Sequence, residues 1–288
     1  MSLIQESSVD IILCCYNSED TIVECVGSLL SQTHRDIRVL IFDDASTDKT
    51  VEKICQIKDK RITLVKSSQN VGTYAGKNFL LKNHSRSEFI ALQDADDYSH
   101  PDRIKLQISR MIQKEYLVVG TSVYETGDKS KAHTDSFDVF TEGERKNKYP
   151  ETIDCGILAE IENNLSTEKG YDDYLKIKIC MNGTVMFRRS DLMTIGGWDG
   201  ETRIAGDTDI FLRLLMFDKQ RLIYNLQEVL YTRVFNKESL TASSEYGIKS
   251  NTRRSYNMSL RPKILKNLWK SEMYFPDFKV EKIICAEL

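Results

Sequence analysis

The sequence predicts an α/β protein built on a doubly wound, mostly parallel central sheet. Over the first ~120 residues, short apolar runs typical of buried strands alternate with segments whose apolar residues recur at helical spacing. Two of these runs end in clustered aspartates. Because open α/β sheets bind ligands just outside the carboxyl ends of their strands, the acidic run ends predict a binding site at that edge.

The composition is that of an ordinary soluble globular protein, since 41% of the 288 residues are hydrophobic and 29% are charged. The net charge of −3, from 40 Lys and Arg against 43 Asp and Glu, gives no basis for binding nucleic acid. No apolar run approaches the ~20 residues that span a bilayer, and the N-terminus lacks the basic and apolar blocks of a signal peptide. We therefore expect a soluble cytoplasmic protein.

The seven cysteines form no C-x-x-C pair. Several lie within apolar strand or helix patterns, which predicts free, buried thiols in a reducing compartment and argues against a zinc site. The cysteines are Cys14, Cys15, Cys25, Cys55, Cys155, Cys180 and Cys285.

The first half of the chain contains five predicted strands with four helices between them. Each helix shows a one-face apolar period, and the last begins at His100-Pro101-Asp102, where the fixed φ of proline suits a first helical position. The predicted strands are Val9–Cys15, Arg38–Phe42, Arg61–Lys66, Phe89–Leu92 and Tyr116–Gly120. The predicted helices are Ile22–Leu30, the turns around Val51–Cys55, Thr73–Asn83 and Pro101–Ile112.

The alternation of strand-like and helix-like apolar patterns is lost between Glu125 and Lys178. A long irregular segment of this kind indicates a functional lid, a binding loop or a partly ordered insertion. Strand and helix patterns then resume. From Asn236 onward the chain is polar, apart from a basic stretch with helical spacing. We expect one domain over residues 1–235 and a C-terminal loop and helical extension over 236–288. The later predicted elements are strand Thr184–Phe187, helix Ser190–Ile195, a turn at Gly196–Asp199, a helix from Asp207, strands Arg221–Asn225 and Val229–Val234, and helix Arg261–Lys270.

The buried strand Phe89–Leu92 runs into three carboxylates within four residues, Asp94, Asp96 and Asp97. Like charges this close repel unless a cation or hydrogen bonds compensate. An Asp-x-Asp pair at the end of a strand suits a hard divalent ion that also holds a diphosphate. The alternative is a solvated acidic turn.

These motifs, in this order and spacing, resemble glycosyltransferase family 2, the inverting nucleotide-sugar transferases with the Rossmann-like GT-A fold. The resemblance is strong over 8–112, moderate over 183–235, thin over 121–180 and weak beyond 242, and it is closest to bacterial polysaccharide, capsule or lipopolysaccharide transferases. It implies a nucleotide-sugar-binding half over 1–120 and an acceptor-binding half over 121–235. The matching segments are Ile12–Asn17, Ser28–Thr33, Asp43–Asp48, Asn70–Gly72, Lys77–Asn78 and Asp94–Asp97.

The resemblance implies that Asp44, at the end of the second strand, accepts the N3–H of uracil; a turn aspartate is the alternative. Tyr16 would lie against the uracil ring, or would be a buried aromatic near a turn. Lys77 would lie near the diphosphate, or would be a helix-surface lysine. Cys14 stands where many relatives have Thr or Pro. The residues implied to bind the donor are Cys14, Tyr16, Asn17, Asp44, Gly72, Lys77, Asp94, Arg233 and Lys237.

Asp94 and Asp96 take the Asp-x-Asp role in this resemblance and would hold Mn²⁺ or Mg²⁺, with Asp94 also facing the donor ribose. Asp97 would support the turn. Some relatives add a histidine ligand from the second half, but the last of the four histidines here is His133.

The second half would supply the catalytic base. The family's usual signature is Glu-Asp before a helix ending in Leu-x-Arg. Aligning Arg213 with the arginine of this signature places Asp207 at the base position, with Asp209 as the fallback. Gly206 stands in place of the glutamate, which puts that residue's acceptor contact in doubt. Asp207 could instead be a helix N-cap.

The remaining implied contacts lie late in the chain. Trp198 would pack near the acceptor sugar, or would be a core tryptophan. Arg233 and Lys237 would belong to a mobile loop over the diphosphate, or to a solvated basic loop. The helix Arg261–Lys270 could touch an anionic membrane, or could serve packing or oligomerisation.

The resemblance therefore implies a metal-dependent inverting transferase that uses a UDP-sugar and a glycan or glycolipid acceptor. A polyprenyl-phosphate sugar transferase would use the same donor half, although such enzymes often bring membrane helices that this sequence lacks. A nucleotide-sugar-binding module without turnover is the non-enzymatic alternative, which the Gly206 departure keeps open.

Overall fold

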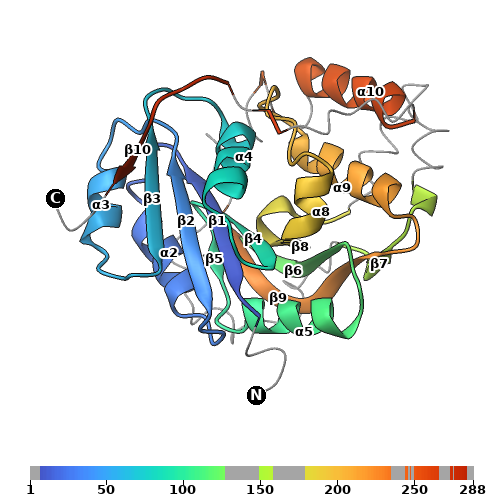
Figure 1. Cartoon of the computed structure of the whole chain (residues 1–288), viewed down its shortest axis with the longest axis horizontal. Helices are drawn as coiled ribbons and strands as arrows, with labels where there is room; N and C mark the ends of the chain where they lie inside the picture. The colour runs from blue at the N-terminus through green and yellow to red at the C-terminus, as the bar shows by residue number, and fades with distance from the viewer. Residues whose placement is uncertain are drawn as a thin grey trace.

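The computed structural model describes residues 7–126, 149–157, 179–234, 244–245, 247, 250–265, 273–274 and 276–283. Strands and helices alternate along its first part, as predicted (Figure 1). The elements are β1 (Val9–Cys15), α2 (Ile22–Leu30), β2 (Ile37–Asp43), α3 (Thr50–Gln56), β3 (Ile62–Ser67), α4 (Thr73–Asn83), β4 (Phe89–Asp94), β5 (Tyr98–Ser99), α5 (Arg103–Gln113), β6 (Val118–Thr126), β7 (Thr152–Ile153), the 3₁₀ helix η3 (Asn182–Thr184), β8 (Met186–Arg188), α8 (Arg189–Thr194), α9 (Gly206–Phe217), β9 (Ile223–Val234), α10 (Asn251–Leu265) and β10 (Val280–Ile283).

The described strands form one sheet in the order β10-β3-β2-β1-β4-β8-β6-β9-β5, with β7 paired to β9. β1 pairs in parallel with β2 and with β4, so their carboxyl ends meet at one edge. In this register Cys14 is opposite both Phe42 and Asp94, and Cys15 is opposite Asp43. The two acidic strand ends therefore flank the end of β1, as the sequence predicted.

The second half of the sheet is mixed. β8 is antiparallel to both β4 and β6, while β6 is parallel to β9. The two strands predicted over 221–234 are one strand, β9, because the partly exposed residues around Gln227 and Glu228 form an irregularity in its pairing with β6 and not a break. β6 also continues to Thr126, beyond its predicted end at Gly120.

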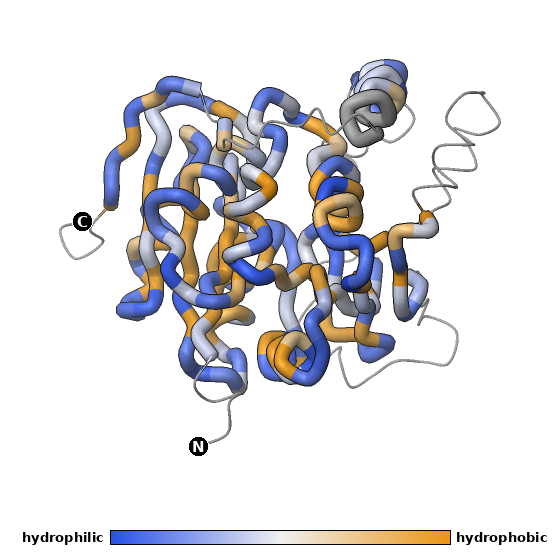
Figure 2. Tube along the Cα trace, turned by 45° about the vertical axis from the view of Figure 1, so that its right-hand side comes forward, coloured by the Kyte–Doolittle hydropathy of each residue, from blue (hydrophilic) through white to orange (hydrophobic). Residues whose placement is uncertain are grey.

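Helices cover both faces of the sheet, and side-chain alternation along the strands gives each face its own core. In β1, Ile12 packs into the core beneath α4, α8 and α9, whereas Ile11 and Leu13 pack with α2 and α5. Figure 2 shows the apolar residues along the strands and inner helix faces, with polar residues outside. The sheet is therefore buried on both sides, as continuous apolar strand runs require.

The C-terminal extension returns to the first half of the chain. α10 confirms a helix there, although it begins earlier than the predicted Arg261, and residues 266–272 lie outside the described residues. The extension also contains the unpredicted strand β10, antiparallel to β3 at the sheet edge. Phe278 anchors this return, with its ring centroid 5.8 Å from that of Phe42 and 5.5 Å from that of Phe79.

Five of the cysteines are free thiols, as predicted: Cys14, Cys15, Cys25, Cys155 and Cys180. Cys55 is disulfide-bonded, so the prediction is wrong at this position. The absence of a C-x-x-C pair therefore did not exclude a disulfide.

None of the helices in the described part of the chain combines the length and the apolar character needed to cross a membrane.

Phe278→Ala should lower the free energy of unfolding by about 1–3 kcal/mol, because the partly buried ring joins the β10 segment to the core aromatics. Urea unfolding at equilibrium measures the change. Val280→Ala is the control: Val280 is exposed in the same segment, and its loss should cost under about 0.5 kcal/mol. Equal effects of the two substitutions would show that the aromatic contact does not hold the segment.

Candidate active site

Asp44 follows β2 directly, and its carboxylate lies at the edge formed by the parallel strands. Its Oδ1 accepts a hydrogen bond from the Val71 amide (2.7 Å) and its Oδ2 from the Gly72 amide (2.9 Å). Burial raises the pKa of Asp44, opposed by these two amides and then by the Arg203 guanidinium. Gly72 adopts φ 92°, a left-handed conformation that favours glycine, so this residue shapes the turn around the carboxylate.

The loop after β1 lies beside the loop after β2. Asn17, at φ 48°, donates its backbone amide to Ser46 Oγ (2.9 Å), and its Oδ1 accepts from the Thr47 amide (2.9 Å). Asn17 thus joins the two loops. Neighbouring Tyr16 is 50% exposed, so the buried-aromatic alternative is wrong and its ring is open to a ligand.

Asp97 is buried and supports the acidic turn, as predicted. Its Oδ1 accepts a hydrogen bond from the Val234 amide (2.9 Å). Burial, followed by the charges of Asp96 and Asp94, raises the pKa of Asp97 well above its usual range. The turn therefore concentrates negative charge.

Two residues that the sequence analysis missed shape the surroundings of Asp94. Its backbone amide donates to Tyr231 Oη (3.2 Å). A Cβ on Gly183, in η3, would lie 2.7 Å from Asp94 Oδ2, and it would also collide with the Tyr231 hydroxyl oxygen. Gly183 is therefore needed for the close approach of η3 to this carboxylate.

The acidic turn fits a divalent ion that is also bound by a ligand. No group of three or more His, Cys, Asp or Glu side chains among the described residues is arranged to hold a metal. A site built from Asp94 and Asp96 matches Mg²⁺-type sites, in which one or two carboxylates are joined by substrate phosphates and water. The charge that raises the Asp97 pKa is the charge that such an ion would offset.

Lys77 lies inside the molecule, 2% exposed, so the helix-surface alternative is wrong. Its Nζ lies 5.5 Å from the Tyr74 ring centroid and 6.0 Å from that of Trp198. The Cys14 thiol lies within electrostatic reach of Lys77, Asp44 and Asp94 together. Burial, the largest effect, raises the pKa of Cys14 to about 12, so the thiol stays neutral between them.

Asp207 lies in the first turn of α9. The N-cap residue is Ala205, in the left-handed conformation at φ 55°, so the N-cap alternative for Asp207 is wrong. Asp207 Oδ1 is buried and has no hydrogen-bond partner. An unpaired buried carboxylate oxygen is uncommon, and a bound water, an ion or a catalytic role would each account for it.

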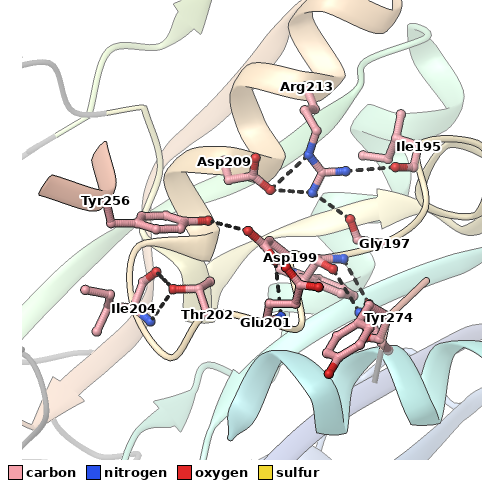
Figure 3. A network of polar contacts seen from close by, with 12 residues as sticks. Ile195, Gly197, Asp199, Glu201, Thr202, Ile204, Asp209, Arg213, Tyr256 and Tyr274 are labelled. Carbon is pink, nitrogen blue, oxygen red and sulfur yellow. Dashed lines mark hydrogen bonds and ion pairs between the residues drawn. The ribbon is translucent and has the colours of Figure 1, made fainter. Parts of the chain in front are cut away.

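The Asp209 carboxylate is paired with an arginine inside the protein and does not face a ligand site. Its Oδ2 accepts from Arg213 Nε (2.9 Å), and Arg213 also donates to the carbonyl oxygens of Ile195 (2.8 Å) and Gly197 (2.7 Å) (Figure 3). Both Asp209 and Arg213 are buried. The structure therefore corrects the predicted acceptor-binding role and the fallback base role of Asp209, since its carboxylate is paired within the core.

Trp198 is 2% exposed and packs edge-on against Phe187, so the core alternative describes it better than the predicted acceptor contact. Asn78 of α4 holds its backbone: Asn78 Oδ1 accepts the Trp198 amide (2.9 Å), and Nδ2 donates to the carbonyls of Trp198 and Tyr274 (2.8 Å each). Sequence analysis matched Asn78 to the family but gave it no role. It links α4, the loop before α9 and the C-terminal segment.

The predicted basic loop is only partly described. Arg233 lies within β9 and forms an ion pair with Glu125 of β6 (3.6 Å), so it belongs to the sheet and not to a loop. Lys237 lies outside the described residues. Arg203, which was not predicted, reaches from the loop before α9 and donates to Asn70 Oδ1 (2.8 Å) and to the Asn70 carbonyl (3.1 Å).

Comparison with known proteins gives one family. The family described as Glycosyl transferase family 2 matches residues 10–196. The putative glycosyltransferase EpsE of Bacillus subtilis (strain 168) is 32% identical over 250 residues, which cover 83% of this chain and 79% of EpsE. The Escherichia coli UDP-Glc:alpha-D-GlcNAc-diphosphoundecaprenol beta-1,3-glucosyltransferase WfaP is 37% identical over 125 residues, 39% of this chain and 49% of WfaP.

Solved structures confirm the predicted GT-A fold. The mannosyltransferase PcManGT from Pyrobaculum calidifontis, solved in complex with GDP-Man and Mn²⁺, superposes with a TM-score of 0.58 at 16% identity. The superposition covers 90% of this chain and 70% of PcManGT. At this identity the likeness concerns the fold alone.

Gly183→Ala should lose metal-dependent nucleotide binding, because the added methyl group must displace Asp94 or Tyr231. Thermal unfolding with and without UDP and Mn²⁺ measures this: the ligand-induced stabilisation of the unsubstituted protein should disappear. Gly27→Ala, in α2, is the matched control, because a Cβ there meets nothing within 4 Å. Retention of the full stabilisation by Gly183→Ala would show that the close approach of η3 is not needed.

Proposed function

The chain belongs to glycosyltransferase family 2, and from this premise we propose that it transfers a sugar from a nucleotide-sugar, with inversion, to a lipid-linked sugar or glycan in cell-surface polysaccharide synthesis. One observation carries the proposal. Asp94 is opposite Cys14 in the pairing of β1 with β4, and the Asp44 amide bonds the Cys15 carbonyl (2.8 Å), so both aspartates lie at the end of β1. Lys77 lies within electrostatic reach of Cys14. This arrangement would offer an acceptor for a base N–H, a carboxylate for a metal ion and a cation for phosphate close to one another.

We expect a UDP-sugar as the donor. Asp44 already accepts two amides, one on each oxygen, but a carboxylate has about four lone-pair sites, so it can also accept the N3–H of uracil. The exposed ring of Tyr16 is available to the base, while Asn17 and Gly72 shape the surrounding loops. The relative WfaP, whose name gives UDP-Glc as its donor, supports the choice of nucleotide.

Asp94 and Asp96 would hold Mn²⁺ or Mg²⁺ together with the donor diphosphate. When bound, the ion would supply positive charge to the departing diphosphate. Lys77 would add a second positive charge in a site where burial strengthens its effect. The Mn²⁺ in the PcManGT complex supports a divalent ion in this fold.

Asp207 would act as the base. The acceptor oxygen bonds to the anomeric carbon, the bond from that carbon to the diphosphate breaks with its electron pair going to the diphosphate, and the acceptor proton passes to Asp207. The unpartnered Oδ1 of Asp207 supports this role, because its proton-accepting site is not taken by another group. General-base assistance of this kind is typically worth ~10²–10⁴ in rate.

The acceptor proposal rests on relatives. WfaP is named as acting on GlcNAc-diphosphoundecaprenol, a sugar carried on a lipid diphosphate. We expect this chain to use an acceptor of the same class, which would bring it to the membrane surface. Part of the expected membrane-contacting stretch, residues 266–270, lies outside the described residues.

A ligand panel tests the donor and the metal together. Thermal unfolding with UDP-, dTDP- and GDP-sugars should show a Mn²⁺-dependent rise in Tm for UDP-sugars and none for GDP-sugars, because Asp44 would accept the N3–H of a pyrimidine base. Thymine carries the same N3–H as uracil, so the dTDP-sugars show whether the site also distinguishes between the two pyrimidines. Asp94→Asn and Asp96→Asn should each reduce that rise. A metal-independent shift, or a preference for guanine nucleotides, would contradict the assignment of the acidic turn or of Asp44.

Asp207→Asn should lower sugar transfer by roughly 10²–10⁴-fold while leaving donor binding unchanged. Release of UDP during transfer to a lipid-linked sugar measures turnover, and the thermal shift measures binding. Asp218→Asn is the matched control at the other end of α9, where Asp218 accepts backbone amides outside the site, and it should remain active. Tight donor binding without turnover in the unsubstituted protein would instead indicate a binding module.

A further inference from the structure

We propose that Arg203 is a positioning residue for recognition of the donor base: its guanidinium holds the turn 70–72, and this turn fixes the carboxylate of Asp44. The inference rests on the proposed function, because it concerns how the base of the donor nucleotide is recognised. Arg203 lies in the second half of the chain, outside the half that the resemblance implies for donor binding. It was not among the predicted site residues.

The turn 70–72 is bonded to Asp44 through three consecutive residues. The carboxylate accepts the amides of Val71 and Gly72, one on each oxygen. The side-chain nitrogen of Asn70 donates to the Asp44 carbonyl (3.3 Å). The direction of the lone pairs that remain on the carboxylate, which the N3–H of a pyrimidine would need, therefore depends on where this turn lies.

Arg203 contacts both ends of the same turn. Its Nη1 donates to Asn70 Oδ1 (2.8 Å) and its Nη2 to the Asn70 carbonyl (3.1 Å), so one guanidinium binds the side chain and the backbone of one residue. A Cβ on Gly72 would lie 3.6 Å from Arg203 Cγ, so the aliphatic part of the arginine lies along this glycine. The Asn70 side chain accepts from Arg203 and donates to Asp44, and it thus connects the two.

The loop that carries Arg203 is itself held in place. Thr202 Oγ1 donates to the Ile204 carbonyl (2.9 Å) and accepts the Ile204 amide (3.2 Å), which makes a tight turn with Arg203 at its centre (Figure 3). The Thr202 amide donates to the Asp199 carbonyl (3.3 Å), and the Asp199 carboxylate accepts from Tyr256 of α10 (2.9 Å). The arginine therefore projects from a fixed point in the second half of the chain toward the turn 70–72.

A role in stability alone would not explain these contacts well. Arg203 is exposed, and so are its bonds to Asn70, which compete with bonds to water and contribute little to folding. Its charge also acts on Asp44: burial raises the pKa of this carboxyl group, and the Arg203 guanidinium is among the groups that oppose the rise. The ionised carboxylate is the form that only accepts hydrogen bonds, as a base N–H requires.

Arg203→Gln tests the proposal in titration calorimetry with Mn²⁺ and two nucleotides, UDP and N3-methyl-UDP, which lacks the N3–H. The unsubstituted protein should bind N3-methyl-UDP roughly 10-fold more weakly than UDP. Arg203→Gln should weaken UDP binding roughly 3- to 10-fold, the size of one net hydrogen bond, and leave N3-methyl-UDP binding unchanged. An equal loss with both nucleotides, or no loss with either, would overturn the proposal.

Arg188→Gln is the matched control. Arg188 makes the same kind of paired contact, from Nη1 to Glu88 Oε1 (3.1 Å) and from Nη2 to the Met111 carbonyl (2.6 Å), but it lies opposite Phe89 at the amino end of β4. Both Kd values should stay unchanged in this variant. Without ligand, Arg203→Gln should lower Tm by less than about 2 °C. A larger fall would show that Arg203 serves the stability of the fold, contrary to the proposal.

A double-mutant cycle with Asn70→Ala shows whether Arg203 acts through Asn70. Both substitutions interrupt one chain of hydrogen bonds to Asp44. The factor by which the double variant raises the Kd for UDP should therefore be smaller than the product of the two single factors. A factor equal to that product would show that the two residues act independently, and would overturn the proposal.

Amide hydrogen exchange measures the turn directly and without a ligand. The amides of Val71 and Gly72 should exchange faster in Arg203→Gln, while those of β1 remain protected. Unchanged protection of the two turn amides would show that the turn does not depend on Arg203.

The nucleotide titrations also separate the possible failures. If the unsubstituted protein does not bind UDP, the proposed function fails and the present inference fails with it. If it binds UDP and N3-methyl-UDP equally, the role of Asp44 is wrong. If it distinguishes the two nucleotides equally well with and without Arg203, only the present inference fails.

Discussion

The parallel register of β1 with β2 and β4 is the constraint on which the site depends. It brings the aspartates after β2 and at the end of β4 to either side of Cys14. A slip of one residue in either pairing would turn every side chain of the strand to the opposite face. The two cores prevent that slip, because alternate residues of β1 are buried on opposite faces of the sheet. The geometry of the acidic edge is thus specified by apolar packing distant from it.

The negative charge of the acidic edge is partly offset by a buried cation behind it. Arg103, fully buried, donates to the carbonyls of Leu92 (3.0 Å), Gly183 (3.4 Å) and Thr184 (3.3 Å), which ties η3 to β4. Its guanidinium lies over the Tyr231 ring, 5.6 Å from the centroid. A fixed cation behind the acidic turn and a metal ion in front of it would together reduce the repulsion among the aspartates. The first is part of the fold, and the second would arrive with the substrate.

The sequence was sufficient for the features that are local. Apolar runs that end in aspartates predicted β2, β4 and the acidic edge. Asp207 followed only from the resemblance to the family, whose signature was aligned on Arg213. The pairing of Asp209 with Arg213 was also readable, since residues four apart on a helix face each other. The roles of Tyr231 and Gly183 could not be predicted from the sequence. Each depends on a contact with a residue that lies far away in the sequence, and spacing carries no information about such contacts. β10 was missed because its residues are mostly exposed and show no apolar period.

The turn that leads into α9 contains two features that lower the stability of the fold and that an ordinary helix start does not have. Ala205 adopts a left-handed conformation, which costs an L-residue roughly 1–2 kcal/mol. The unpaired Asp207 oxygen adds about 1–3 kcal/mol of uncompensated desolvation. Neighbouring contacts offset these costs: Arg213 ties the helix to the preceding loop, and Tyr256 of α10 bonds Asp199 (2.9 Å) in that loop. If the turn served packing alone, a serine or asparagine at the N-cap and a paired carboxylate would be more stable. A carboxylate oxygen without a donor, next to a loop fixed by Arg213 and Tyr256, is consistent with the base role proposed for Asp207.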